Sequence, residues 1–274
     1  MSDSHGYPLG YSAEEARRLT VQAAMLEDLT ADLLRRAGLA PGMRVLDLGC
    51  GVGDVSMLAA RIVGQSGSVL GVDRAASSLE LARHRASALH AGQVRFLQAE
   101  LDTFATKERF DALVGRLVLL YLPEPAAILR RLVPLLDPGG IVAFQEYDMS
   151  QSAQSPPSTL FMQVRRWLLD AFVAGGAELD MGTKLYSAFV RAGLPSPTMI
   201  AASRVECGPT TQGYEYFTSV LRSLLPLIER SGIASAEQVG IDTLAQRMRE
   251  DAVRHERVLF PPRVVGAWSR IPSA

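Results

Sequence analysis

Short apolar runs alternate with helix-like segments between residues 45 and 148, and this alternation is the clearest pattern in the chain. Apolar strands that alternate with amphipathic helices are typical of a parallel sheet covered on both faces. We therefore predict a doubly wound α/β fold here. The expected strands lie at 45–48, 69–72, 94–97, 110–114 and 141–144, and the expected helices at 55–63, 77–91 and 123–136.

Local signals mark some of these boundaries. Ser12 and Glu15, and later Ser77 and Glu80, have the spacing of a capping box at a helix start. The sequence Asp-Pro-Gly-Gly at 137–140 predicts a turn before the fifth strand.

The segments on either side of this region are richer in helix. A polar arm over residues 1–11 precedes apolar residues at helical spacing, which predict one or two amphipathic helices ending near Gly38. After a Ser-, Gln- and Pro-rich linker at 150–158, the order becomes less regular. We expect helices at 159–174, 184–192, 212–231 and 235–255, and strands at 198–205 and 263–269.

Composition and charge exclude several classes of protein. The 274 residues carry 28 Lys and Arg against 29 Asp and Glu, which gives no long-range attraction to nucleic acid or anionic membranes. The longest apolar run, 117–122, is far shorter than the roughly 20 residues that cross a bilayer. Cys50 and Cys207 match no disulfide framework or paired metal spacing, and the N-terminus lacks an export pattern. We expect a cytoplasmic monomer or homodimer without nucleic-acid partner, membrane insertion or metal.

A glycine-rich loop follows the first strand and opens a helix. Its small residues, Gly49, Cys50, Gly51 and Gly53, let the backbone approach a ligand closely. A dinucleotide fold would have Gly-x-Gly-x-x-Gly, whereas the third glycine here comes one place early. Asp47 stands two residues before the loop, where a carboxylate is unfavourable for a pyrophosphate but well placed for the ammonium of an amino-acid ligand.

This pattern resembles the first motif of class I S-adenosylmethionine-dependent methyltransferases, over roughly residues 40–148. The segments 110–114, 122–125 and 136–140 are similar to the branch that includes quinone-pathway and natural-product small-molecule methyltransferases. The resemblance implies a Rossmann-like sheet and S-adenosylmethionine (SAM) as methyl donor, with S-adenosylhomocysteine (SAH) as product. It also implies an N-terminal helical lid at 1–40, a SAM-binding core at 41–148, and remaining strands with a helical cap at about 209–256 within 149–274.

Further donor-binding candidates come at the ends of successive strands, where open α/β sheets bind ligands. Asp73, followed by Arg74, could hold both ribose hydroxyls, or could serve only as an acid at the start of a helix. Glu100 and Leu101 stand where the family contacts adenine, with a solvated loop charge as the alternative.

Two other regions are placed near the methionine part of the donor by the resemblance. Gly115 and Arg116 end the fourth strand; Arg116 could clamp a carboxylate, bind the substrate or form a structural ion pair. Tyr11 and Gln22 belong to N-terminal segments that close over the donor in the family, although packing of the helix and disorder of the arm are alternatives.

The candidate catalytic residues are Glu146, Tyr147 and Asp148, at the end of the fifth strand. If the strand persists, Glu146 and Asp148 share one face with Cα atoms roughly 6.6 Å apart. They could act as a base, as substrate ligands or as half of a magnesium site. The alternative is that they are strand-end charges contacting the N-terminal helices or the cap.

Together these features predict a SAM-dependent methyltransferase acting on a small, fairly apolar acceptor of natural-product or quinone-like type. Whether O, N or C is methylated stays open. An NAD-type oxidoreductase is disfavoured by the glycine spacing and by Asp47. A SAM-binding regulatory protein without turnover is the other alternative.

Overall fold

The computed structural model describes residues 8–10 and 13–273, and these residues divide into two compact units. The sheet unit contains residues 23–146, 181–201 and 265 onward. The helical unit contains the described residues up to 22, together with 147–180 and 202–264.

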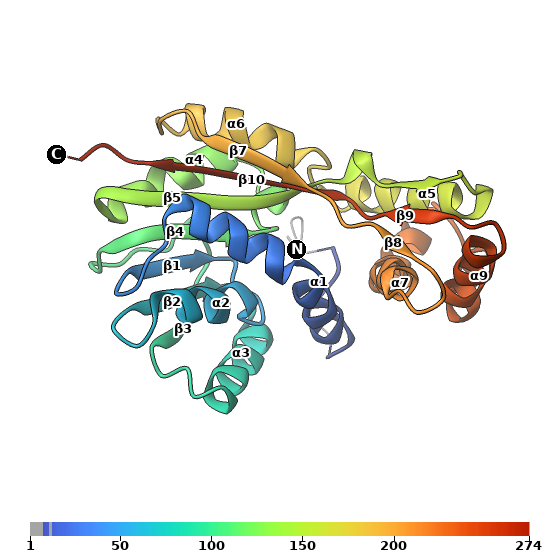
Figure 1. Ribbon diagram of the computed structural model, residues 1–274, viewed down its shortest axis with the longest axis horizontal. Helices are drawn as coiled ribbons and strands as arrows, with labels where there is room; N and C mark the ends of the chain where they lie inside the picture. The colour runs from blue at the N-terminus through green and yellow to red at the C-terminus, as the bar shows by residue number, and fades with distance from the viewer. Residues whose placement is uncertain (1–7, 11–12, 274) are drawn as a thin grey trace. The chain divides into compact units, whose positions relative to one another are not determined.

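The sheet unit is built on seven strands in the order β3-β2-β1-β4-β5-β10-β7 (Figure 1). Central β1 pairs in parallel with β2 on one side and with β4 on the other, and β3 and β5 extend this parallel arrangement. The chain order reverses between β1 and β4, and ligands of open α/β sheets bind at such a point, beyond the carboxyl ends of the strands. The strands are β1 (Arg44–Leu48), β2 (Ser68–Asp73), β3 (Val94–Gln98), β4 (Phe110–Arg116), β5 (Leu136–Asp148), β7 (Thr198–Ala202) and β10 (Arg263–Arg270).

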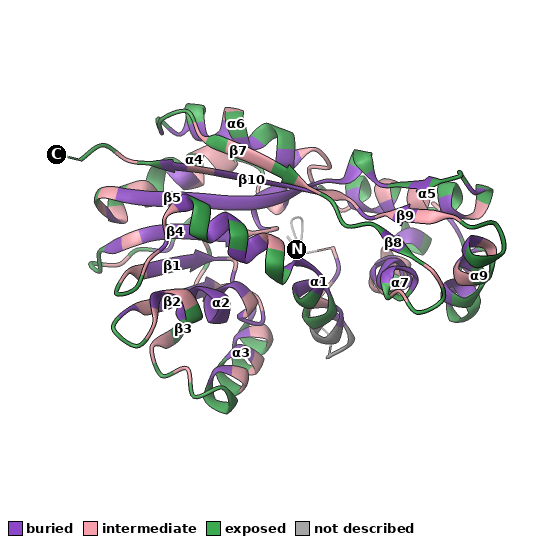
Figure 2. Cartoon of the chain, in the orientation of Figure 1, coloured by how far each residue is buried: buried purple, intermediate pink, exposed green. Residues whose placement is uncertain are grey.

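Helices cover both faces of this sheet because its central strands are apolar on both sides. Ala143 of β5 belongs to a buried cluster with α2 (Asp54–Val63) and the second half of α1 (Ala13–Ala37). Its neighbour Phe144 points the other way and packs edge-on against Phe189 of α6 (Met181–Arg191), with ring centroids 6.4 Å apart. The buried colour of β1, β4 and β5 in Figure 2 reflects this double covering. The predicted doubly wound, mainly parallel sheet is therefore confirmed.

Several predicted details in the sheet unit are wrong. Helix α3 (Ala76–Ala88) begins at Ala76, and no side chain caps it, so Ser77 and Glu80 form no capping box. Helix α4 (Pro125–Leu132) ends early in a 3₁₀ turn at Val133–Leu135. The predicted turn at 137–140 lies inside β5 as an irregularity, where Phe110 aligns with Leu136 but Ala112 aligns with Ile141. The other predicted capping box includes Ser12, which lies outside the described residues.

In the described residues, the helical unit contains the first part of α1, four further helices (α5, α7, α8 and α9) and a small antiparallel sheet in the order β6-β9-β8. Helices α5 and α9 both contact α7. The elements are α5 (Thr159–Ala174), α7 (Gly213–Arg230), α8 (Ala236–Val239), α9 (Ile241–Arg254), β6 (Ala153–Ser155), β8 (Glu206–Cys207) and β9 (Val258–Phe260).

The predicted helix at 159–174 is confirmed, and three other expectations for this segment need correction. The linker at 150–158 contributes β6, and the strand predicted at 198–205 ends at Ala202. The helix predicted at 235–255 is divided at Gly240, whose φ of +57° is left-handed and ends α8 before α9 begins.

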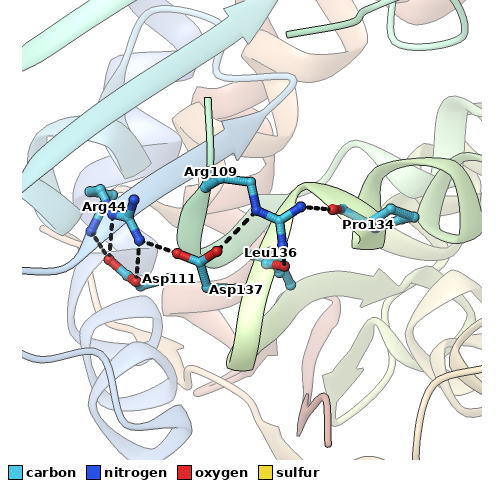
Figure 3. A network of polar contacts seen from close by, with 6 residues as sticks. All are labelled: Arg44, Arg109, Asp111, Pro134, Leu136 and Asp137. Carbon is cyan, nitrogen blue, oxygen red and sulfur yellow. Dashed lines mark hydrogen bonds and ion pairs between the residues drawn. The ribbon is translucent and has the colours of Figure 1, made fainter. Parts of the chain in front are cut away.

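An ionic network joins the amino ends of three strands (Figure 3). Arg44, the first residue of β1, donates from its guanidinium and its backbone N–H to Asp111 of β4, both at 2.7 Å. Asp137 of β5 accepts from Arg44 and, at 2.9 Å, from Arg109. Hydrogen bonding to Arg44 lowers the pKa of Asp111. This network lies at the edge of the sheet opposite the carboxyl ends of the strands.

Candidate functional site

Three glycines shape the loop after β1, and the physical reason for having glycine is not the same at all three positions. All have left-handed φ, +61° at Gly49, +53° at Gly51 and +85° at Gly53. A Cβ at Gly49 would meet Val118 at 2.3 Å, and one at Gly53 would meet Phe96 at 2.9 Å. At Gly51 no described atom lies within 4 Å of that position. Packing therefore explains Gly49 and Gly53, whereas the Gly51 backbone faces open space.

Two further contacts hold this loop in place. Arg85 of α3 donates to the carbonyl of Val52 at 2.7 Å and forms an ion pair of 2.6 Å with Asp54, the first residue of α2. The N–H of Cys50 donates to the carbonyl of Val72 at 3.1 Å. Burial raises the pKa of the Cys50 thiol well above its usual value, so this side chain is a neutral packing group.

Asp47 is buried beneath the loop, and only one of its two carboxylate oxygens accepts a hydrogen bond from a described residue. Its Oδ2 accepts from the Ser56 hydroxyl at 2.6 Å, while Oδ1 has no hydrogen-bond partner among the described residues. Burial raises the pKa of Asp47 to about 7, although the Ser56 hydrogen bond and the charge of Arg116 act in the opposite direction. A buried carboxylate oxygen without a partner is unfavourable unless a donor or cation satisfies it.

Asp73 ends β2 and holds the backbone of the glycine loop. Its Oδ2 accepts from the N–H of Gly51 at 2.8 Å, and its Oδ1 accepts from the N–H of Ala75 at 2.9 Å. Each oxygen keeps lone pairs for a ligand hydroxyl. The carbonyl of Arg74 accepts from Gln98 at 3.0 Å, which ties this turn to the end of β3.

The segment after β3 forms a turn around Glu100 and Leu101. The carbonyl of Glu100 accepts from the N–H of Phe104 at 2.8 Å, and the Glu100 side chain is exposed. The carbonyl of Leu101 accepts from the guanidinium of Arg131. These contacts fix the backbone and leave the Glu100 carboxylate in solvent.

At the end of β4, Gly115 and Arg116 have different neighbours. A Cβ on Gly115 would lie 2.5 Å from the ring of Phe144, so the close packing of β4 on β5 requires glycine. Arg116 donates to the hydroxyl of Thr30 at 3.0 Å, and Thr30 donates to the side-chain oxygen of Gln145 at 2.7 Å. Arg116 is thereby connected to α1 and β5.

Glu146 is fully buried and anchors the turn that follows β4. Its Oε1 accepts from the N–H groups of Val118 at 3.0 Å and Leu119 at 2.8 Å, while Oε2 has no partner among the described residues. Burial raises the pKa of Glu146 to about 8, against the lowering effect of these hydrogen bonds. The preceding Leu117 has a left-handed φ of +54°. The carboxyl group thus stabilises a turn that also packs on the glycine loop through Val118.

The other two candidate catalytic residues lie in the helical unit. The Tyr147 hydroxyl is 3.1 Å from that of Tyr216, and Gln22 donates to both. Asp148 forms an ion pair with Arg263 and accepts from Ser150 at 2.8 Å. Glu146 and Asp148 share no hydrogen-bond partner within the described part of the chain.

Two predicted site residues, Tyr11 and Gln22, remain to be placed, and two contacting residues were not predicted. Tyr11 lies outside the described residues. Gln22 is buried in a polar network and contacts two tyrosines. Sequence reasoning missed Tyr216, because an aromatic residue at helical spacing is indistinguishable from ordinary core in the pattern alone. It also missed Ser56, whose hydroxyl is the partner of Asp47.

Across 8–10 and 13–273, no group of three or more His, Cys, Asp or Glu side chains could hold a metal ion. In the same residues, no helix combines the length and apolar character needed to span a bilayer.

Comparison with known proteins agrees with this geometry. The methyltransferase-domain family matches residues 39–193. A 2-phytyl-1,4-naphthoquinone methyltransferase of Synechococcus elongatus is 37% identical over 139 residues, 50% of this chain and 57% of that relative. The ubiquinone biosynthesis O-methyltransferase of Bordetella bronchiseptica is 31% identical over 191 residues, 66% of this chain and 68% of the relative. The chain therefore spans little more than half the length of the naphthoquinone relative.

A solved structure supports the same fold. A candidate methyltransferase from Bacillus halodurans C-125 has a TM-score of 0.60 at 18% identity, and the match covers 89% of this chain and 99% of that one. The family match spans more than half of the sequence, includes the glycine loop, and coincides with the parallel sheet. The chain belongs to the methyltransferase-domain family.

Proposed function

We propose that this protein transfers the methyl group of SAM to a small, fairly apolar acceptor of quinone-like or natural-product type. The observation that carries this proposal is the pairing of an open Gly51 backbone with the unpartnered Oδ1 of buried Asp47. An open backbone bend accommodates a close-fitting ligand, and a buried carboxylate oxygen favours an ammonium group. The α-ammonium of SAM satisfies this requirement, whereas a pyrophosphate would be repelled.

The surrounding residues fit the rest of the donor. Asp73 keeps acceptor capacity for the ribose hydroxyls while it orients Gly51. Glu100 and Leu101 would contact the adenine, and Gly115 and Arg116 the methionine part. We also retain Arg74, Cys50, Gly49 and Gly53 as backbone neighbours of the donor, and Tyr11 and Gln22 as lid residues.

Catalysis by this site depends on position more than on acid–base chemistry. SAM supplies an electrophilic methyl group on a sulfonium, and the acceptor atom must lie about 3 Å from that carbon in line with the breaking bond. Glu146 orients the Val118–Leu119 turn through Oε1, and Oε2 is the atom proposed to exchange a proton with the acceptor. Tyr147 and Asp148 are proposed as acceptor-binding groups.

The organisation of the whole protein is also a proposal. We infer that residues 1–40 form a lid, 41–148 the SAM-binding core, and about 209–256, within 149–274, a cap over the acceptor. We also propose that the protein is a cytoplasmic monomer or homodimer. Its near-neutral charge favours the absence of a nucleic-acid partner.

Two measurements test the proposed function. Calorimetry should detect binding of SAM and SAH and no binding of NAD; preference for NAD would favour an oxidoreductase. Incubation with SAM and a panel of hydroxylated aromatics and quinols should then release SAH in an acceptor-dependent manner. Tight SAM binding without turnover across the panel would instead favour a regulatory protein.

A further inference from the structure

Two side chains of opposite charge lie at the carboxyl ends of neighbouring strands in the sheet unit. Asp47 belongs to β1 and Arg116 to β4. Asp47 is aligned with Val114, so Arg116, two residues further along β4, points to the same face of the sheet. The positive charge of Arg116 acts to lower the pKa of Asp47, which places the two groups within electrostatic reach of each other. An acid beside a base matches the ammonium and the carboxylate that an α-amino acid carries on one carbon.

Arg116 also lines a pocket that is bordered by α1, α2 and α3. Among the described residues, the charged lining consists of three arginines and two acids, which leaves an excess of positive charge. Both acids form ion pairs with the other two arginines, Glu27 with Arg61 and Asp54 with Arg85. The pocket therefore favours an anionic group beside Arg116.

The backbone at Arg116 is held by β5. Arg116 is aligned with Gln145, and the carbonyl of Gln145 accepts from the N–H of Leu117 at 2.9 Å. These contacts fix the point from which the arginine side chain starts. They do not fix the guanidinium, because a long side chain retains several rotatable bonds.

A buried hydroxyl on α1 holds the other end of this side chain. Thr30 is 2% exposed, and its hydroxyl lies 2.7 Å from the side-chain oxygen of Gln145 and 2.9 Å from the carbonyl of Leu26. Its single proton is donated to one of these oxygens at a time, so its lone pairs can accept from Arg116. Nη1 of Arg116 donates to Thr30 at 3.0 Å. Since the guanidinium is a rigid plane, this hydrogen bond restricts the direction of all its donors.

We propose that Thr30 is a positioning residue that holds Arg116 for the α-carboxylate of SAM, and that this pair makes the site selective for a carboxylated donor. Asp47 and Arg116 then recognise the two charges of the donor's amino-acid end separately. Decarboxylated SAM, which keeps only the ammonium, is discriminated against. This inference rests on the proposed function and deepens it, because it assigns the part of the donor that determines selectivity.

Calorimetry on the full chain tests the inference with two probes. One is SAH, and the other is decarboxylated SAH, which keeps the ammonium and the adenosyl group. Wild type should bind SAH at least about tenfold more tightly, because hydrogen bonds to a charged group are strong. Arg116→Met should bind the two probes within about twofold of each other, since it removes the charged partner of the carboxylate.

Substitutions of Thr30 test its positioning role. Thr30→Val keeps the shape of the side chain and removes the hydroxyl. This variant should bind SAH about three- to tenfold more weakly, while its affinity for decarboxylated SAH stays within about twofold of wild type. Thr30→Ser restores the hydroxyl and should keep the wild-type preference. Thr30→Ala, which also lacks the hydroxyl, is measured in the same way and should lose the same preference.

Thr218→Val is the matched control. Thr218 of α7 is 4% exposed, and its hydroxyl has no hydrogen-bond partner among the described residues. The same chemical change at this position should leave the affinities for both probes as in wild type.

Three results would overturn the inference while the proposed function stands. They are equal binding of the two probes by wild type, an unchanged preference in Thr30→Val and Thr30→Ala, and equal weakening of both probes in these variants, which would indicate a general structural role. Failure of wild type to bind SAH contradicts the proposed function, and the inference then falls with it.

Discussion

Two buried carboxyl groups determine how the candidate site responds to pH. Asp47 and Glu146 both have pKa values raised by burial, to about 7 and about 8, and each has one oxygen without a partner among the described residues. Both carboxyls lie near the carboxyl ends of strands of the same sheet, β1 and β5, and perturbed carboxyls at this edge of a sheet are typical of functional sites. The two carboxyls lead to separate predictions, because Asp47 lies beneath the glycine loop whereas Glu146 stabilises the turn after β4.

Donor affinity should depend on the protonation of Asp47. If the SAM ammonium binds the ionised carboxylate, the affinity rises with pH until Asp47 is deprotonated, near pH 7. Calorimetry should give a dissociation constant that falls up to about tenfold from pH 5.5 to pH 7, a range in which the ligand amine stays charged. Asp47→Asn should bind SAM more weakly, with a flat profile over this range. An unchanged slope in the variant would remove Asp47 from the donor site.

Turnover should depend on Glu146 in a different pH range. An acceptor that must lose a proton needs ionised Glu146, so kcat should rise as pH increases through about 8. Glu146→Gln keeps an oxygen that can accept from Val118 and Leu119, and we expect near-normal SAM affinity with kcat lowered about 10²-fold or more. Steady-state kinetics from pH 6.5 to 9 checks this. Equal kcat and pH profile in both proteins would leave Glu146 with a purely structural role.

The loop between β1 and α2 is the element on which we propose that donor binding depends. Its three glycines look equivalent in the sequence, but only Gly51 faces open space, while Gly49 and Gly53 are required by packing against Val118 and Phe96. The carboxylate of Asp73 then sets the direction of the Gly51 N–H. The loop thus combines backbone shape with a fixed carboxylate.

Substituting Gly51 should separate donor binding from folding. Gly51→Val introduces a β-branched side chain at a left-handed φ and fills the space left for a ligand. We expect SAM binding to fall below detection in calorimetry. Gly193→Val is the matched control, because Gly193 also has a left-handed φ, +83°, with no described atom within 4 Å of its Cβ position. Both variants should lose similar thermal stability, and only the control should bind SAM. Weak binding by both would indicate a general folding defect.

The elements differ in how well the sequence predicts them. Strands β1, β2, β4 and β5 were predictable because their apolar runs are buried on both faces of the sheet. Strands β8 and β9, of two and three residues, carry too few positions for a pattern. The Ser77–Glu80 spacing was misleading because α3 already begins at Ala76 with Ala75 as its N-cap, so that Ser77 lies inside the helix. Asp47 could be identified from its position before the glycine loop. Tyr216 could be identified only from the fold, which brings α7 to α1 and to Tyr147.

At the scale of the whole molecule, the same two carboxyls link folding to pH. Their folded-state pKa values exceed the ordinary values of 3.8 and 4.5, so the folded protein binds more protons than the unfolded chain between about pH 4 and 8. Their contribution to stability is complete below the ordinary values and is lost as pH rises through about 7 and 8.

Denaturant unfolding of the ligand-free protein should reveal this linkage. The free energy of unfolding should decrease from pH 5.5 to 8.5, with each carboxyl contributing at most about 1.4 kcal/mol per pH unit. The double variant Asp47→Asn and Glu146→Gln should show a smaller decrease over that range. A decrease equal to that of wild type would contradict the assigned burial of the two charges.

The ionic network of Arg44, Asp111, Asp137 and Arg109 connects β1, β4 and β5 at the edge of the sheet opposite the glycine loop. Arg44 and Asp137 have side chains that are 43% and 37% exposed, so dissolved ions can screen their attraction. A high concentration of sodium chloride should therefore weaken the ionic contacts at the amino ends of β1, β4 and β5. The carboxyl ends of these strands should stay aligned. Thermal stability should then fall with salt concentration independently of the affinity for SAM. This independence would help in choosing conditions for crystallising the complex.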